Sequence, residues 1–228
     1  MRYTNSPMAS YTKLSPNHSG LRTHAIDRIT PHCVVGQCTV EWLGNWFAKT
    51  STQASSNYGI DKDGRVGMYV EEKNRSWCSS SNENDQRAVT IECASDTKSP
   101  YAMNSRVYAA LADLCADICR RNGKARLLWI GDRQKSLAYK PKDEEMILTV
   151  HRWFANKSCP GDWLYSRLGR LAADVTTRLQ PDADQEVKAA AGTSLLRIQC
   201  GAFSNRENAE KRVRDLKAAG FDAVIIED

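Results

Sequence analysis

The sequence lacks the long apolar segments that mark membrane-spanning and exported proteins. None of its apolar runs approaches the roughly 20 residues that a membrane helix needs. Residues 1–20 also lack the continuous apolar core of a signal peptide. We therefore expect a protein made in the cytoplasm without a signal peptide and without a membrane partner, which reaches any external substrate by another route.

Basic runs interleaved with aromatic residues, which are typical of nucleic-acid-binding proteins, are also missing. The 228 residues carry a net charge of +5, and this charge is unevenly distributed. Residues 1–180 carry a net +7, whereas residues 181–228 carry a net −2. A mildly basic main domain fits an anionic partner such as cell wall, and nucleic acid is the weaker alternative.

Eight cysteines are present, but they are scattered along a chain without an export signal, which disfavours a secreted disulfide framework. Cys115 and Cys119 lie one helical turn apart on an apolar face, where buried thiols are common. Cys33 and Cys38 bracket a short loop, and the sequence leaves open whether they form a disulfide. Cys159 is the cysteine whose neighbours, Lys157 and a Cys-Pro-Gly turn, do not resemble packing.

The hydrophobic pattern predicts an α/β fold with a mixed central β-sheet that is flanked by helices. Residues 25–36 predict a strand with His32 at its end, and residues 56–70 predict a hairpin that turns at Asp63-Gly64. A helix over residues 39–50 would place Trp42, Leu43, Trp46 and Phe47 on one stripe. Further strands are predicted over 88–95 and 144–151, and further helices over 104–123 and from 164 to 175.

The composition divides the chain into parts. We expect a catalytic domain over residues 1–180, of which residues 1–26 form an irregular N-terminal arm. Residues 181–193 have the composition of a linker. Residues 194–228 predict a small βαβ module whose helix begins with a capping box of Ser204 and Glu207.

The stretch "HRWFANKSCPGDW" carries the strongest chemical signal. Only four histidines are present, and two of them, His32 and His151, fall at predicted strand ends. Cys159 lies in the turn that follows the second histidine. Two imidazoles and one thiolate are the ligands of a catalytic zinc site that keeps a fourth position open. A structural histidine or a core thiol is the alternative for each residue taken alone.

These motifs, together with "ITPHCVVG", resemble the zinc-dependent N-acetylmuramoyl-L-alanine amidases, a family that includes phage endolysins and peptidoglycan recognition proteins. The resemblance covers about residues 20–180. It implies a Zn²⁺ ion on His32, His151 and Cys159, and an oxyanion-stabilising role for Lys157. The family's fold is a mixed sheet with zinc in a surface groove.

The resemblance also implies which residue acts as general base. Lysozyme-type phage amidases place a tyrosine at the position of Ser56, so we expect Tyr58 to be a core residue. The segment "VTIECASD" is similar to the strand in which other relatives carry a glutamate, which gives Glu92 the role of base. An unpaired glutamate within such an apolar run is costly to bury; the alternative is a glutamate that faces solvent.

The loop over residues 71–88 borders the substrate groove in similar endolysins, which makes Trp77, Asn84 and Arg87 candidates for substrate contact. The C-terminal module resembles half of a SPOR domain, a fold that binds glycan strands. We expect it to bind the wall, or to pair with a second copy in a homodimer.

Together these features predict a peptidoglycan hydrolase that cleaves the amide bond between N-acetylmuramic acid and L-alanine, in the manner of a phage or prophage endolysin released at lysis. Two other functions stay open at this point. One is a non-catalytic peptidoglycan-binding protein. The other is a cell-wall cysteine peptidase in which Cys159 is the nucleophile and His151 the base.

Overall fold

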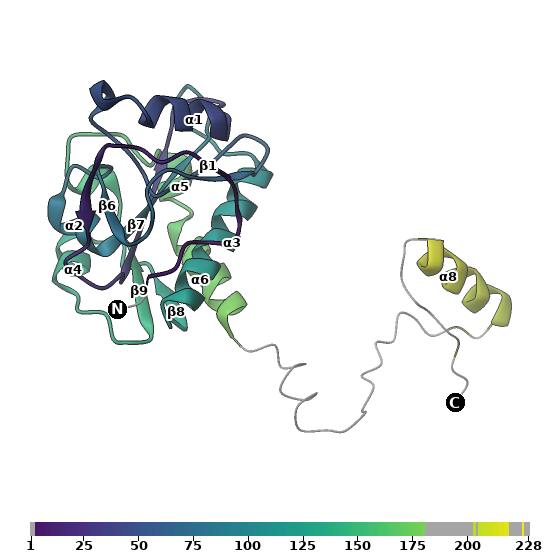
Figure 1. Cartoon of the computed structure of the whole chain (residues 1–228). Coiled ribbons are helices and arrows are strands. Elements are labelled where there is room, and N and C mark those ends of the chain that lie inside the picture. Colours follow the sequence, from purple (N-terminus) through teal and green to yellow (C-terminus); the bar gives the residue numbers. More distant parts are fainter. Residues whose placement is uncertain (1–2, 181–202, 204, 219–224, 226–228) are drawn as a thin grey trace. The chain divides into compact units, whose positions relative to one another are not determined.

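A mixed seven-stranded sheet lies at the centre of the first of two units, Met1–Pro181 and Asp182–Asp228 (Figure 1). The computed structural model describes residues 3–180, 203, 205–218 and 225. The strand order is β1-β5-β4-β7-β3-β9-β8. The strands are β1 (Ala9–Thr12), β3 (Arg28–Cys33), β4 (Tyr58–Ile60), β5 (Val66–Met68), β7 (Ala88–Cys93), β8 (Arg126–Leu128) and β9 (Glu145–Leu148).

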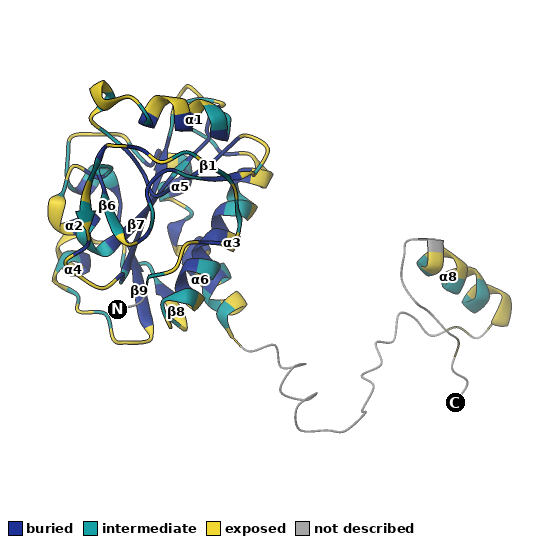
Figure 2. Ribbon diagram, viewed as in Figure 1, coloured by how far each residue is buried: buried dark blue, intermediate teal, exposed yellow. Residues whose placement is uncertain are grey.

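Parallel pairing dominates the centre of this sheet. Strands β4, β7, β3, β9 and β8 run parallel to one another, whereas β4 and β5 form the expected antiparallel hairpin. Every residue of β3 and β9 is buried, as is usual for parallel strands that are covered on both faces (Figure 2). The prediction of a mixed central sheet flanked by helices is confirmed.

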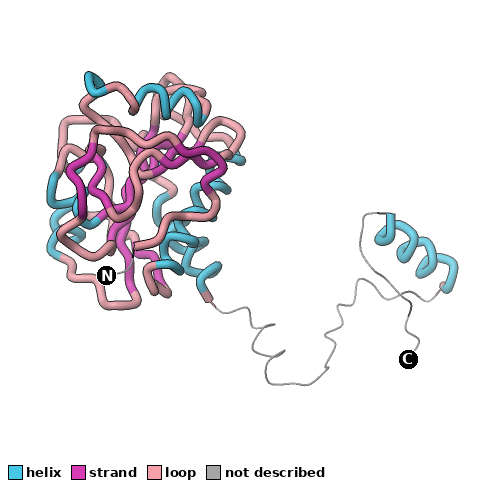
Figure 3. Tube along the Cα trace, viewed as in Figure 1, coloured by secondary structure: helices cyan, strands magenta, loops and turns pink. Residues whose placement is uncertain are grey.

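Helices and 3-10 turns surround the sheet (Figure 3). Helix α3 packs against α6 and against strands β4 and β7, and α1 packs against β1, β4 and β5. The Asn104 side chain caps α3 by accepting a hydrogen bond from the Val107 amide. The elements are α1 (Val40–Phe47), η1 (Thr50–Thr52), α2 (Asn82–Arg87), α3 (Ser105–Arg121), α4 (Arg133–Ala138), η2 (His151–Trp153), α5 (Asp162–Tyr165) and α6 (Leu168–Leu179).

The N-terminal segment is more regular than we expected. Strand β1 pairs in parallel with β5, and β2 (His18–Leu21) pairs with β6 (Asn74–Ser76) in a separate two-stranded sheet. Both N-terminal strands alternate between half-buried and exposed residues. Their polar composition therefore reflects strands with one open face, and the expectation of an irregular arm over residues 1–26 is wrong in this respect.

Helix α1 buries a different stripe from the one expected. Its buried residues are Val40, Leu43, Gly44 and Phe47. Trp42 and Trp46 are 51% and 46% exposed, and their rings stack on each other with centroids 5.8 Å apart. Both tryptophans lie on the neighbouring, open side of the helix because one position along a helix turns the side chain by about 100°.

In the second unit the structure describes helix α8 (Arg206–Ala218). Apart from Phe203 and Ile225, the two strands expected on either side of it lie outside the described residues, as does Ser204. Among the described residues, no helix has the length and apolar character that a membrane crossing requires. The described cysteines, Cys33 and Cys38 among them, are free thiols.

Candidate metal centre

His32 and Glu92 lie side by side at the carboxyl end of two parallel strands. In the pairing of β3 with β7, the Cα of His32 is in register with that of Glu92. Residues in register on neighbouring strands project to the same face of the sheet. The His32 Nδ1 and Glu92 Oε1 atoms are 3.9 Å apart. His32 is only 1% exposed, whereas the Glu92 side chain is 19% exposed and so faces a partly open space.

His151 and Cys159 approach His32 from the segment that follows β9. His151 opens η2, because the observed strand β9 ends at Leu148, three residues before the predicted end. Its ring centroid lies 5.1 Å from that of His32. The Cys159 Sγ atom is 3.3 Å from His32 Nδ1. Donor atoms of the three residues all lie within 4.8 Å of one another, so the structure brings together the three expected ligands.

The turn that presents Cys159 is tightly constrained. The Cys159 carbonyl accepts a hydrogen bond from the Arg152 amide, and the Arg152 side chain forms an ion pair with Asp162. Gly161 has a φ of 83°. A Cβ atom at this position would lie 2.8 Å from the Pro100 carbonyl oxygen. Only glycine adopts this conformation in this space without strain, which explains the Cys-Pro-Gly sequence.

Burial favours the neutral form of both imidazoles. It lowers the pKa of His32 well below its usual value, and the nearby His151 adds to this effect. Burial also lowers the pKa of His151, with a smaller contribution from the positive charge of Lys157. A neutral imidazole has a free lone pair, which is the form that binds a metal ion.

The thiol and the carboxyl group hold their protons more strongly than usual. A hydrogen bond with Cys33, together with burial, raises the pKa of Cys159 well above its normal value. Burial raises the pKa of Glu92 to about 7, the range that suits a general base at neutral pH.

The donor set fits a divalent zinc ion. Two imidazoles and one thiolate are borderline-soft ligands of the kind found in zinc sites. Furthermore, the buried Glu92 Oε2 atom, beside this donor set, has no hydrogen-bond partner among the described residues. Buried polar atoms without a partner are rare and call for an explanation such as a bound ion.

Cys78 is a site residue that the sequence reasoning missed. Its Sγ atom lies 3.8 Å from Glu92 Oε1, and His32, Cys78 and Glu92 form a second group of closely spaced donor atoms. Burial and the charge of Glu92 raise the pKa of this thiol well above its usual value, so it remains a hydrogen-bond donor. No motif marks Cys78, because its contact with β7 arises only from the tertiary fold.

Lys157 lies in an exposed part of the turn between His151 and Cys159. Its amide donates to the Ala155 carbonyl, which folds this turn back on itself. The electrostatic effect of Lys157 on His151 places its charge near the donor set. Its role in stabilising an oxyanion stays a prediction.

The structure overturns two of the three expected substrate contacts. Asn84 is completely buried, and its side chain binds Thr30 and Thr149. Arg87 precedes β7, at the opposite end of the strand from Glu92, and forms an ion pair with Asp27. Both side chains are therefore engaged in interactions within the fold.

Trp77 is half-buried, whereas Tyr58 is completely buried. The indole N–H of the half-buried Trp77 donates to the Ser19 hydroxyl at 2.7 Å, and a role in substrate contact stays a prediction. Tyr58 is completely buried and donates its hydroxyl proton to Glu72. This position agrees with the core role that we expected. Ser56 is also buried, and its hydroxyl donates to the Tyr58 carbonyl.

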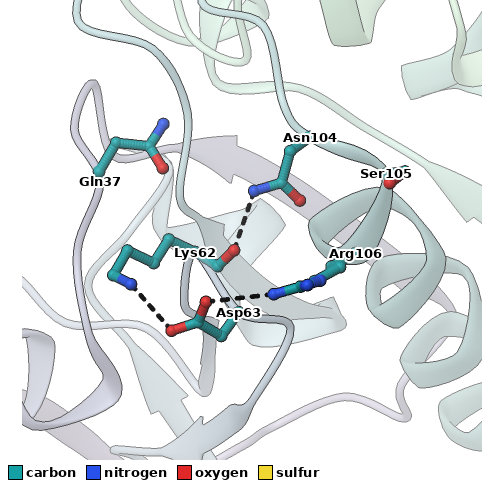
Figure 4. Close-up of a pocket in the computed structure, with 6 residues that line it drawn as sticks. All are labelled: Gln37, Lys62, Asp63, Asn104, Ser105 and Arg106. Carbon is teal, nitrogen blue, oxygen red and sulfur yellow. Dashed lines mark hydrogen bonds and ion pairs between the residues drawn. The ribbon is translucent and has the colours of Figure 1, made fainter.

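A polar pocket of about 370 Å³ lies between the segments that follow β3 and β4 and the start of α3 (Figure 4). Its charged groups are already paired with one another: Asp63 binds both Lys62 and Arg106. The Asn104 side chain donates to the Lys62 carbonyl. The pocket contains none of the metal-donor residues, so it is separate from the candidate centre. Its lining residues are Gln37, Lys62, Asp63, Asn104, Ser105 and Arg106.

Two family models match this chain. A family model described as N-acetylmuramoyl-L-alanine amidase matches residues 22–162, and a model described as SPOR domain matches residues 192–228. No curated protein sequence matches the chain.

Among solved structures, a selenomethionine derivative of AmpD is similar with a TM-score of 0.53 and 17% identity, covering 75% of this chain and 99% of that one. A mutant endolysin from Bacillus subtilis has a TM-score of 0.52 and 12% identity, covering 72% and 97%. The catalytic domain of XlyA has a TM-score of 0.51 and 11% identity, also covering 72% and 97%. At these identities the similarity establishes the fold alone.

Proposed function

The chain belongs to the N-acetylmuramoyl-L-alanine amidase family, and we propose that it cleaves peptidoglycan with a zinc ion held by His32, His151 and Cys159. The bond is the amide between the lactyl group of N-acetylmuramic acid and L-alanine of the stem peptide. One observation carries this proposal: the three donors, which come from β3 and from the segment after β9, lie within 4.8 Å of one another.

The amidase and SPOR matches together indicate a protein that binds peptidoglycan and acts on the cell wall. We propose that the second unit holds the polymer while the first unit hydrolyses it, and that two copies pair through the second unit. Use as a phage or prophage endolysin fits a protein with both a hydrolytic and a wall-binding unit.

When bound, a zinc ion supplies Lewis-acid chemistry that polarises the scissile carbonyl and lowers the pKa of water to about 7. The chain's own residues supply the proton transfers. A Glu92 carboxylate oxygen accepts a proton from the attacking water and then delivers it to the departing nitrogen of L-alanine. The pKa of about 7 lets Glu92 both accept and return this proton near neutral pH.

Lys157 has a different task in this scheme. As attack proceeds, the carbonyl oxygen gains negative charge, and a nearby ammonium group stabilises that charge more than it stabilises the neutral substrate. The position of Lys157 in the turn that presents Cys159, together with its electrostatic effect on His151, supports this role.

The test uses purified peptidoglycan, with new L-alanine amino termini and new reducing ends measured in parallel. We expect new amino termini without new reducing ends, loss of the reaction with a chelator, and recovery on addition of zinc. His32→Ala serves as the control that lacks one ligand. Release of reducing ends in place of amines would assign the enzyme to glycoside cleavage and reject the proposal.

The cysteine-peptidase alternative is disfavoured by the geometry at Cys159. The hydrogen bond of its thiol to a ring nitrogen goes to His32, whereas this alternative pairs Cys159 with His151. The raised pKa of Cys159 also opposes the thiolate form that a nucleophile needs. Activity that persists in a chelator and disappears on thiol alkylation would favour this alternative. The non-catalytic alternative predicts binding to the wall without release of amines.

A further inference from the structure

The loop between β6 and α2, residues 77–81, contacts two different residues of the candidate centre. The Ser80 hydroxyl lies 2.9 Å from His151 Nε2. The Cys78 thiol lies 3.8 Å from Glu92 Oε1, within the range of a hydrogen bond to sulfur. One short loop thus meets both an expected metal ligand and the expected base.

Hydrogen bonds to Ser55 and Asp85 hold this loop in place. Upstream, the Trp77 amide donates to the Ser55 hydroxyl and its carbonyl accepts from the Ser55 amide. Within the loop, the amides of Cys78 and Ser79 both donate to Asp85 Oδ2, at 3.0 and 3.1 Å. Asp85 is 2% exposed. A buried carboxylate that accepts two amides fixes the backbone from which Cys78 projects.

Ser80 has a strained backbone that aims its hydroxyl at His151. Its φ is 61°, in the left-handed region that non-glycine residues enter at a cost. Strain of this kind persists where the surrounding structure determines it, and it clusters at functional sites. The hydroxyl itself is exposed, so burial of the side chain does not account for the conformation.

We propose that residues 77–81 position the catalytic centre, with Ser80 accepting a hydrogen bond from His151 Nε2–H and Cys78 donating one to Glu92. Because the proton then resides on Nε2, the His151 Nδ1 lone pair is free for the metal. A hydrogen bond to the second ring nitrogen is the usual way in which proteins select the tautomer of a metal ligand. Ser80 and Cys78 are positioning residues in this assignment, and neither needs to touch the substrate. The proposal rests on the amidase function proposed above.

The test for Ser80 uses the full-length protein and does not depend on activity. Nitrogen-15 NMR of the metal-free protein reports the tautomer of His151, and competition with a chelating dye reports zinc affinity. We expect the Nε2–H tautomer in the wild type, both tautomers in Ser80→Ala, and a zinc affinity about 10- to 100-fold weaker in that variant. Alanine meets the same left-handed strain as serine, so the two proteins differ mainly in the hydroxyl. Ser51→Ala, at an exposed serine on η1, is the matched control and should retain wild-type affinity.

A wild-type His151 that is mostly the Nδ1–H tautomer would overturn the assignment of Ser80, as would unchanged zinc affinity in Ser80→Ala. Either result leaves the amidase activity itself intact, so it rejects the positioning role alone. Conversely, absence of amine release from peptidoglycan would reject the proposed function while the tautomer and affinity results stand.

The test for Cys78 compares Cys78→Ala with Cys78→Ser on peptidoglycan. Serine keeps a donor at this position, whereas alanine removes it. We expect alanine to lower kcat about tenfold with little change in KM, and serine to restore most of the loss. Equal activity of the alanine variant and the wild type would overturn this half of the proposal. A fall in both variants with loss of zinc would show that Cys78 supports the fold and does not position Glu92.

Discussion

His32 Nδ1 and Cys159 Sγ lie 3.3 Å apart, although 127 positions separate them in the chain. Strand β3 supplies the imidazole, and the turn after η2 supplies the thiol. A site assembled from such distant segments depends on the whole first unit. Changes at the donors, at the residues around them and in the core should therefore have different and separable effects.

Zinc affinity should increase with pH. The raised pKa of Cys159 means that the thiol must release a proton before it binds the ion, whereas the lowered pKa values of His32 and His151 mean that the imidazoles are already neutral. We expect affinity to rise about tenfold per pH unit between roughly pH 6.5 and 8, which corresponds to release of one proton. Calorimetry in buffers of different ionisation enthalpy measures this number directly. Affinity independent of pH would contradict the assignment of Cys159 as a ligand.

Glu92→Gln should lower kcat about 10²- to 10⁴-fold, because glutamine cannot accept the proton. The same change should stabilise the metal-free protein. Burial raises the pKa of Glu92 from its usual 4.5 to about 7, so the folded wild type loses stability as pH rises through this window. The stability difference should be near zero below pH 4.5 and reach about 3 kcal/mol above pH 7. Denaturant unfolding with a chelator present, at several pH values, measures it; a constant difference would argue against a buried carboxyl.

Lys157→Met should reduce kcat without loss of zinc. Removal of one oxyanion stabiliser costs about 2.7 to 4 kcal/mol, or about 10²- to 10³-fold in rate. Because the Lys157 charge lowers the pKa of His151, the variant should also raise that pKa. Steady-state kinetics and metal analysis of the same preparation separate the two effects. A variant with normal kcat would remove Lys157 from the mechanism.

Tyr58→Phe should destabilise the protein while leaving kcat within about twofold of the wild type. The Tyr58 hydroxyl donates to Glu72 and accepts from the Ser6 amide, both at 2.7 Å. Its loss leaves buried partners unsatisfied, which costs about 1 to 3 kcal/mol. Tyr69→Phe is the matched control, because Tyr69 is another buried tyrosine and its hydroxyl donates to the Val40 carbonyl. Strong loss of activity in Tyr58→Phe with normal stability would instead reveal a catalytic tyrosine.

Gly161→Ala should weaken both folding and zinc binding. The new Cβ would lie 2.8 Å from the Pro100 oxygen and 2.9 Å from Tyr101 Cβ, in addition to the cost of a φ of 83°. We expect a loss of about 2 kcal/mol or more. Gly123→Ala provides the control, because Gly123 also has positive φ but no atom within 4 Å of the added Cβ. It should lose only about 1 kcal/mol and keep its zinc affinity. Equal losses in the two variants would show that crowding at the Cys159 turn is unimportant.

The sequence predicted the sheet, the main helices and the three donors because each has a local signature. Period-2 and period-3.6 patterns mark the strands and helices, and the Cys-Pro-Gly turn marks the end of the donor segment. Cys78 and Ser80 have no such signature. Their contacts with β7 and η2 arise only when the chain has folded, and cysteine and serine in a polar loop are unremarkable by composition.

The errors have a related cause. Asn84 and Arg87 were expected near substrate because their loop borders the groove in similar proteins. A polar residue that completes a buried network cannot be distinguished by its sequence from one that faces a ligand. Trp42 and Trp46 were expected on one helical stripe with Leu43 and Phe47, yet the structure leaves both tryptophans half exposed. Hydrophobic character alone does not decide which side of a helix is covered.

The register between β3 and β7 has a consequence for how this enzyme can tolerate change. His32 faces Glu92 because six consecutive residue pairs of the two strands match, from Arg28 with Ala88 to Cys33 with Cys93. The main-chain pairing of the two strands, which persists although β3 includes Pro31, thus sets the spacing between the expected ligand and the expected base. Inserting one residue into either strand would turn one of the two side chains to the opposite face. Replacement of an entire connecting loop would leave His32 and Glu92 in register.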